Sequence, residues 1–343
     1  MKPSPAPVEA RPAATAVLLR PAEGSLEVLL TQRPASMRFG GGMFVFPGGR
    51  LEGGESAESA AARETLEETG IAIAADELVP LTRWVTPYGF PVRFDTRFFG
   101  LIVPAGTDVA EPSEEIASWR WLRPTAALEG MAAGELAMWQ PTVVTLQQLE
   151  GIGDRADLAA AFEAAPLASL APARPPPGLE RGRRFETRWA GGIEGGAGVA
   201  TVFGRRRWLI VDPADPTTGT IDAVRAAADA EGATLAGALI TGIDPARHAG
   251  VEMFARSLGL PVAGPPGADG LVPYAVTELA DGATVPWTDQ PLVVAVEPPT
   301  PGQDGPRRWA DRAGRLRLSE PGEPGAGARP ARGPSRRTSG GGR

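Results

Sequence analysis

Residues 49–71 read GRLEGGESAESAAARETLEETGI, and this stretch decides the fold of the amino-terminal part of the chain. A helix that starts near Ser56 places Glu64, Glu67 and Glu68 on one face, because they are spaced three and four residues apart. Like charges at this spacing destabilise a helix, and a cation between them would remove the repulsion. Oxygen-only ligands suit a hard ion, so the face predicts a site for Mg²⁺ or Mn²⁺.

Small residues share this face of the predicted helix, namely Ala57, Ala60 and Ala61. We therefore expect no bulky side chain to cover the carboxylates. The alternative interpretation is a solvated acidic face, which is the usual fate of glutamates clustered on a helix.

The spacing of the whole stretch resembles the Nudix box of Nudix hydrolases. The matching positions are Gly49, Glu55, Arg63, Glu64, Glu67, Glu68, Gly70 and Ile71. Thr65 departs from the pattern, since the family usually has an aliphatic residue there. The resemblance implies a Nudix α/β/α sandwich with a mixed sheet over residues 13–165. Residues 1–12 are interrupted by prolines and predict a disordered leader.

Because of this resemblance, we expect Glu64, Glu67, Glu68 and the carbonyl of Gly48 or Gly49 to hold the metal ion. Arg63 lies one turn before Glu67 and is expected to fix the rotamer of that carboxylate. Two further residues of the box have structural roles by the same resemblance, Glu55 between loop and helix and Gly70 at the end of the helix.

The general base is expected to be Glu64 or a second glutamate in the loop at 111–117. In many Nudix enzymes a glutamate at this distance from the box binds metal or takes a proton. Glu115 is our candidate and Glu114 the alternative. Catalytic roles are thus assigned to Glu64, Arg63 and Glu115.

Candidate substrate-binding residues flank the box on predicted strands and a glycine-rich turn. They are Arg33, Gly48, Arg93 and Arg97. Residues 92–99 alternate in polarity, so Arg93 and Arg97 share one face of a strand, which is either a diphosphate clamp or a solvated polar face. Arg33 faces either substrate or solvent.

Three short stretches resemble the branch of the family that includes peroxisomal coenzyme A diphosphatases. They are SMRFGGGMFVFPGGRLE, WVTPYGFPVRFDTRFF and QPTVVTLQQL. The resemblance implies coenzyme A or acyl-coenzyme A compounds as first choice of substrate, with ADP-ribose or dinucleotides next. The alternative is a catalytically weak nucleotide-sensing or regulatory module.

Composition excludes several classes of partner and site. The chain has no cysteine, so disulfides and thiolate metal sites are excluded, and its net charge of −7 argues against general nucleic-acid binding. No apolar run approaches the roughly 20 residues that span a bilayer. We expect a cytoplasmic protein with a small-molecule substrate, no membrane partner and a possible homodimer.

A Pro- and Ala-rich linker is predicted at 166–185, and residues 186–303 follow as an α/β unit. Its strand ending in Val211-Asp212-Pro213 and a later strand ending in Thr241 resemble the amino half of a metallo-β-lactamase-fold hydrolase. The resemblance implies metal-binding His and Asp after Thr241, where this chain has Gly242, Asp244, Ala246 and Arg247.

Gln303 stands where a later metal-binding His is implied, and His248 is the one histidine of the chain. A lone histidine near a helix start is more often a surface or capping residue than a ligand. We therefore expect no zinc in this half, and a degenerate unit retained for packing, dimer formation or weak ligand binding. Residues 304–343 are rich in Gly, Pro and Arg and predict a disordered tail. Its arginines would contact an acidic surface, or the tail has no function or is read from a shifted frame after Gly302.

Overall fold

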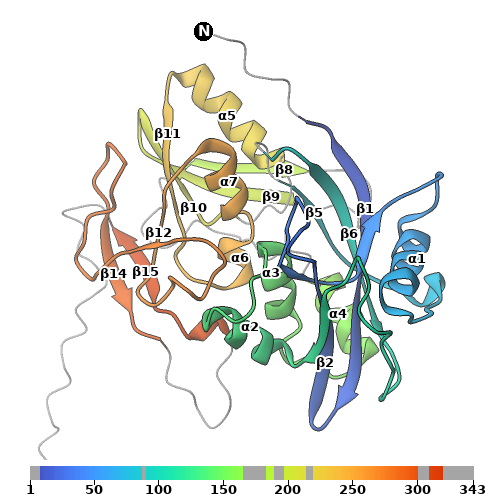
Figure 1. Ribbon diagram of the computed structural model, residues 1–343. Helices are drawn as coiled ribbons and strands as arrows, with labels where there is room; N and C mark the ends of the chain where they lie inside the picture. Colours follow the sequence, from blue (N-terminus) through green and yellow to red (C-terminus); the bar gives the residue numbers. More distant parts are fainter. Residues whose placement is uncertain are drawn as a thin grey trace, which may run out of the picture.

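The computed structural model describes residues 8–86, 90–164, 183–188, 197–213, 219–299 and 309–319. In these ranges the chain forms an amino-terminal α/β domain and a carboxyl-terminal α/β unit (Figure 1). Helix α3 (Gln140–Gln148) lies between the first sheet and the carboxyl-terminal unit.

The amino-terminal domain is built on a mixed sheet with the strand order β3-β2-β1-β6-β5, in which β4 also pairs with β1 and β7 with β2. β1 and β6 run parallel, whereas the other pairs are antiparallel. The strands are β1 (Ala10–Ala22), β2 (Ser25–Gln32), β3 (Phe44–Val45), β4 (Gly48–Arg50), β5 (Val79–Val85), β6 (Arg93–Ile102) and β7 (Ser118–Leu122). This arrangement agrees with the predicted α/β class and mixed sheet.

Helices cover both faces of this sheet, α1 on one side and α2, α3 and α4 on the other (Figure 1). Their bounds are α1 (Ala57–Thr69), η1 (Ala75–Glu77), α2 (Pro124–Ala132) and α4 (Arg155–Ala164). The side chains of β1 alternate between the two cores: Leu18 packs toward α1, whereas Val17 and Leu19 pack toward the other helices. Helix α4 was not predicted, because RADLAAAFEA runs directly into the expected linker.

The alanines of α1 form its buried face, which corrects our expectation that they lie beside open carboxylates. Ala60 and Ala61 are fully buried and pack in one cluster with Ala14 and Ala16 of β1. Small side chains on both elements let the helix lie close to the sheet. The glutamates of α1 are therefore held at the margin of this contact, near strand β4.

The carboxyl-terminal unit contains a second sheet with the order β13-β12-β11-β10-β9-β8, in which β10 to β13 are parallel. Its elements are β8 (Arg183–Arg188), β9 (Ala197–Phe203), β10 (Arg207–Val211), α5 (Gly219–Glu231), β11 (Thr234–Leu239), α6 (Pro245–His248), α7 (Val251–Leu258), β12 (Val262–Gly264) and β13 (Thr277–Glu278). Strand β8 begins within the predicted linker, and residues 165–182 lie outside the described ranges. Likewise, β1 begins at Ala10, within the predicted leader.

The predicted disordered tail at 304–343 is wrong for residues 309–319. They form a 3-10 helix η2 (Trp309–Asp311) and a strand β15 (Arg315–Ser319), which pairs with β14 (Val293–Glu297). Leu316 and Leu318 are buried on one face of β15, a period-two pattern that the Arg-rich composition concealed. Residues 300–308, which include Gln303, and 320–343 lie outside the described part of the chain.

His248 lies at the seam between the two parts and is completely buried, not at the surface or in a cap as we expected. Its Nε2 lies 2.8 Å from Gln147 Oε1, and its Nδ1 lies 2.9 Å from Gln140 Nε2, both on α3. Burial lowers the pKa of His248 to about 3. The imidazole is therefore neutral, donating from Nε2 and accepting at Nδ1.

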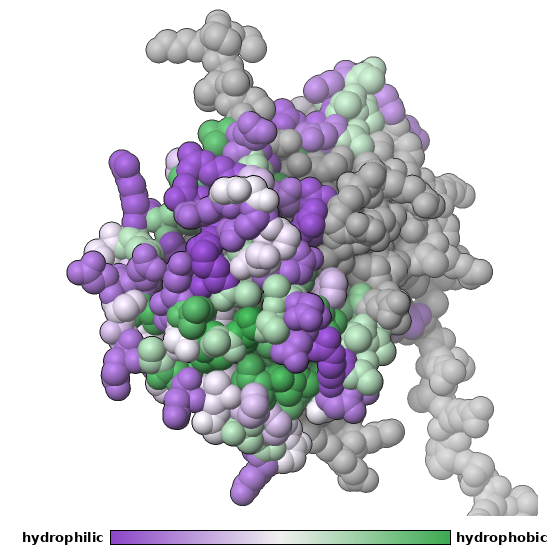
Figure 2. Space-filling model, turned by 90° about the vertical axis from the view of Figure 1, so that its right-hand side faces the viewer, coloured by the Kyte–Doolittle hydropathy of each residue, from purple (hydrophilic) through white to green (hydrophobic). Residues whose placement is uncertain are grey.

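The surface of the α1 side is mixed, with hydrophilic side chains around a lower patch of hydrophobic ones (Figure 2). Among the described residues, Val8 and Leu66 are the large hydrophobic side chains that stand out as exposed. No helix in the described ranges is long and apolar enough to cross a membrane.

Candidate active site

Helix α1 is fixed at both ends by its own sequence. Ser56 caps the amino end, because its side chain accepts a hydrogen bond from the Ser59 amide, and Gly70 ends the helix at a φ of +73°. Thr65, the residue that departs from the family pattern, is buried and donates to the Ala61 carbonyl at 2.7 Å. Because this hydrogen bond satisfies the hydroxyl within the helix, threonine can stand at this buried position, where the family usually has an aliphatic residue.

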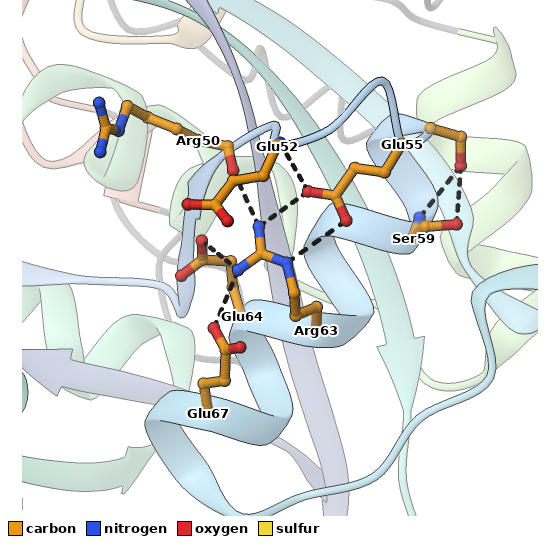
Figure 3. Close-up of polar contacts among 8 residues, drawn as sticks. Arg50, Glu52, Glu55, Ser59, Arg63, Glu64 and Glu67 are labelled. Carbon is orange, nitrogen blue, oxygen red and sulfur yellow. Dashed lines mark hydrogen bonds and ion pairs between the residues drawn. The ribbon is translucent and has the colours of Figure 1, made fainter.

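Arg63 is the centre of the polar network on α1 (Figure 3). Its Nη1 donates to both Glu64 and Glu67 at 2.9 Å, and its Nη2 donates to Glu55 at 2.8 Å and to the Arg50 carbonyl. Arg63 thus lies beside the Glu67 carboxylate, and Glu55 links the loop to the helix. The carboxylates that surround the guanidinium raise the pKa of Arg63 further above its ordinary value.

Gly49 lies directly against the Glu64 carboxylate. A Cβ built on Gly49 would stand 2.3 Å from the carboxyl carbon of Glu64, so only glycine leaves room for this close approach. Burial raises the pKa of Glu64, although the hydrogen bond from Arg63 opposes that shift. β4 and α1 thus meet at the Glu64 carboxylate.

Glu68 is the most enclosed of the three glutamates. Its Oε2 accepts a hydrogen bond from the Gly48 amide at 3.0 Å, so the amide of this expected substrate-binding residue is already engaged within the chain. Burial raises the pKa of Glu68 to about 8, and Glu64 and Glu115 add to the shift while the Gly48 hydrogen bond and Arg33 oppose it. A buried carboxylate in this setting is stabilised by a positive charge beside it.

Arg33 and Glu115 join the glutamates of α1 from distant parts of the chain. Both residues line the same pocket as Glu64, Glu67 and Glu68. The Arg33 Nε is buried and has no hydrogen-bond partner among the described residues. Glu115 follows Ser113, whose hydroxyl accepts from the Glu115 and Ile116 amides, and the buried Ile116 side chain anchors the loop.

Arg93 and Arg97 do not line the pocket, which corrects their assignment to a diphosphate clamp. The pocket takes Phe94, Thr96 and Phe98 from β6, and the strand alternation turns Arg93 and Arg97 to the opposite face. Arg93 is buried and donates to the Thr86 and Val8 carbonyls, so it ties the start of the chain to the sheet.

The pocket has a volume of about 550 Å³ and an aromatic part that the sequence analysis missed. Phe39 contacts three other rings, with centroid distances of 4.8 Å to Trp139, 6.0 Å to Phe94 and 6.1 Å to Phe90. These four residues, the aromatic cluster, come from separate loops and elements. In the sequence they appear only as large aromatic residues in or beside short loops, and residues of a hydrophobic core show the same pattern.

The carboxyl-terminal unit also contributes to the pocket, through Ala249 and Glu252 of the α6–α7 region. Glu252 is 8% exposed, and its Oε1 accepts from Arg256 Nε at 2.5 Å. Burial raises the pKa of Glu252, while Arg256 and the Gln140 amide oppose the shift. Nothing in the sequence of α7 indicated this role.

Carboxylates are the ligands that a hard divalent cation prefers, and such a cation would neutralise the buried Glu68 carboxylate. In the described residues, however, no three acidic or histidine side chains already converge on one point. Glu64 and Glu67 instead share Arg63 Nη1. Each of these carboxylates gives one oxygen to Arg63, so its second oxygen remains available as a ligand.

A second buried acidic group lies in the carboxyl-terminal unit, close to the positions after Thr241 at which the resemblance implied metal ligands. Asp212 accepts from the amide and hydroxyl of Thr241, at 2.7 and 2.6 Å, and from Arg247 Nη1 at 3.2 Å. Arg247 also pairs with Asp244. Burial raises the pKa of Asp212 to about 6 while Arg247 opposes the shift, so a guanidinium supplies the positive charge here.

Residues 10–144 match a protein family described as the NUDIX domain. A similar protein, the putative nudix hydrolase 7 of Caenorhabditis elegans, is 24% identical over 167 aligned residues, which cover 37% of this chain and 57% of the relative. The NAD-capped RNA hydrolase NudC of Stutzerimonas stutzeri is 32% identical over 95 residues, covering 28% and 31%. The chain thus spans less than two thirds of the length of these relatives.

Among solved structures, the NUDIX hydrolase from Alicyclobacillus acidocaldarius is 26% identical to this chain, with a TM-score of 0.36. The alignment covers 46% of this chain and 96% of that protein.

Proposed function

Because residues 10–144 form a Nudix domain, we propose that this protein is a divalent-metal-dependent hydrolase that cleaves the diphosphate bond of a nucleoside diphosphate linked to another group. One observation carries the proposal: Glu64, Glu67, Glu68, Glu115 and Arg33 line one pocket together with an aromatic cluster. Charged groups suit the diphosphate, and aromatic rings suit a nucleobase.

In this proposal Glu64, Glu67, Glu68 and the Gly49 carbonyl would hold Mg²⁺ or Mn²⁺. Such a cation, when bound, neutralises phosphate oxygens and makes a water molecule more acidic. Glu115 or Glu64 would take the proton from the attacking water as general base. Arg63 would act indirectly, by fixing the orientation of the carboxylates that it binds.

Arg33 is proposed to bind the phosphate oxygens of the substrate. Its buried Nε lacks a partner among the described residues, and an unsatisfied guanidinium N–H is costly unless a ligand fills it. Its position near Glu68 would place the phosphate group against the glutamates of α1.

As substrates we place coenzyme A or acyl-coenzyme A first, because of the short sequence matches, and ADP-ribose or dinucleotides next. The similarity to a protein named NAD-capped RNA hydrolase supports including NAD-type compounds. We further infer that the carboxyl-terminal unit derives from a metallo-β-lactamase-like fold, supported by the strand β10 that ends before Asp212 and the helix and strand that follow it.

The test is product release from coenzyme A, acyl-coenzyme A, ADP-ribose, NADH and a nucleoside triphosphate, with and without Mg²⁺. Glu67→Gln is expected to lower kcat about 100-fold or more with little change in KM, because this carboxylate acts on the chemical step. Glu58→Gln, on the same helix but outside the pocket, is the matched control. An equal loss in both variants would refute the assignment.

A second candidate, a nucleotide sensor, is favoured by the engagement of Glu64 and Glu67 with Arg63. In that case the same panel would give saturable binding of one compound and no Mg²⁺-dependent product.

A further inference from the structure

The aromatic end of the pocket is closed by the carboxyl-terminal unit. Glu252 of α7 lines the pocket, and its carboxylate accepts from the Gln140 amide at the first turn of α3. Gln140 follows Trp139 of the aromatic cluster, and Arg256 of α7 lies 5.4 Å from the centre of the Phe90 ring. Glu252 is therefore linked to the aromatic cluster twice, through Gln140 next to Trp139 and through Arg256 beside Phe90.

The polar atoms at this end form an acceptor-rich group. Gln140 Oε1 is buried without a hydrogen-bond partner in the described part of the chain, while Gln140 Nε2 is held by His248. Trp84 also lines the pocket, and its Nε1 donor is similarly unpartnered within those ranges. Both atoms are shielded from the pocket, so the polar contact with a ligand is assigned to the Glu252 carboxylate, whose two oxygens can accept more hydrogen bonds than the two from Arg256 and the Gln140 amide.

The proposed function fixes the direction of the substrate. Arg33 and a cation held by the glutamates of α1 would attract phosphate, so the anionic part of a nucleotide would lie at that end and the base toward Glu252. A base that carries an exocyclic amino group beside a ring nitrogen, as adenine does, presents N–H donors next to an acceptor. Its flat ring would stack on the aromatic side chains.

From these contacts, and given the proposed function, we propose that the carboxyl-terminal unit forms part of the substrate pocket, with Glu252 accepting a hydrogen bond from the amino group of a nucleobase that stacks on the aromatic cluster. The unit is then a specificity element, and its own buried Asp212–Arg247 pair has no part in the reaction. His248 is a positioning residue, because its Nδ1 and its backbone carbonyl accept hydrogen bonds from Gln140 Nε2.

The experiment is calorimetric titration of the full chain with AMP and with purine riboside 5′-monophosphate, which lacks only the amino group. Neither ligand contains a diphosphate, so binding is measured without turnover. We expect AMP to bind about tenfold more tightly to the wild type. In Glu252→Met, of matched side-chain length, the two affinities should become nearly equal, whereas Asp229→Asn on the exposed face of α5 should keep the wild-type ratio.

Glu252→Met leaves the Gln140 amide and Arg256 without this partner, so Glu252→Gln is measured beside it. Glutamine keeps the shape of the side chain, and we expect it to lower the ratio of the AMP affinity to the purine riboside 5′-monophosphate affinity severalfold, because a neutral acceptor makes a weaker hydrogen bond. Equal affinities in the wild type, or a ratio unchanged in both variants, would overturn the inference. Discrimination without hydrolysis of any diphosphate would instead refute the proposed function alone.

Discussion

Substitution of Gly49 by alanine separates the role of this residue in catalysis from its role in folding. The added Cβ would lie 2.3 Å from the Glu64 carboxyl carbon, about 1 Å short of ordinary van der Waals contact. The atoms that it meets belong to the free end of a side chain. Gly49 also does not have a positive φ, so alanine fits its backbone. We therefore expect the Glu64 carboxylate to move by about 1 Å while the fold stays intact.

A displacement of about 1 Å in a positioned catalytic group costs on the order of 100-fold in rate. The free energy of unfolding should change by no more than about 1 kcal/mol, because replacing glycine by alanine also restricts the unfolded chain. Initial rates of Mg²⁺-dependent hydrolysis and urea denaturation of the same preparation measure the two quantities. Gly153→Ala, at an exposed glycine also without a positive φ, is the control and should change neither.

Gly48→Ala provides the contrast, because its Cβ would lie 2.4 Å from the Ala14 carbonyl oxygen in the neighbouring strand. Backbone cannot swing aside as a glutamate can, so this variant should lose stability. If Gly49→Ala kept its turnover within threefold, or lost activity only together with several kcal/mol of stability, the reasoning would be refuted.

Further predictions concern three other residues. Burial favours the protonated Glu68 carboxyl in the folded state, so its contribution to stability is lost as pH rises from about 4.5 to about 8. In EDTA, urea denaturation should therefore show Glu68→Gln ~5 kcal/mol more stable than the wild type at pH 9 and similar to it at pH 4, and parallel pH profiles would contradict this. His248→Ala should lower the free energy of unfolding by ~3 kcal/mol, since it removes the ring contacts of Gln140 Nε2 and Gln147 Oε1 and leaves a cavity in the buried seam. A loss under about 1 kcal/mol in urea denaturation would contradict this role of the ring. Arg63→Lys should lower kcat about 10- to 100-fold with unchanged thermal stability, because an ammonium cannot bind three carboxylates at once; steady-state kinetics and a melting curve test both.

The arrangement around α1 could be predicted from sequence because its determinants are local or tied to a fixed motif. Ser56 and Gly70 cap the helix as their residue types favour, and Arg63 reaches Glu67 because they are one turn apart. Glu115 was placed through resemblance, since loop length alone cannot show that it returns to the pocket.

Other parts of the site depend on tertiary contacts between residues that are far apart in the chain, and patterns in a single sequence do not reveal such contacts. The strand face of Arg93 and Arg97 was ambiguous, because alternation predicts two faces without saying which one is covered by the pocket. Glu252 enters the pocket only because α7 docks on α3. His248 was misjudged for the same reason, as its partners Gln140 and Gln147 are more than 100 residues away.

Trp309 has a consequence for how the protein is made. Its ring is completely buried in the core that contains α2 and α3, and its amide donates to Glu150 of the amino-terminal domain. Domains usually fold in order as the ribosome delivers them. Here the core of the amino-terminal domain is completed by a side chain that lies 159 positions after Glu150, so a nascent chain that stops before residue 309 would leave that core open.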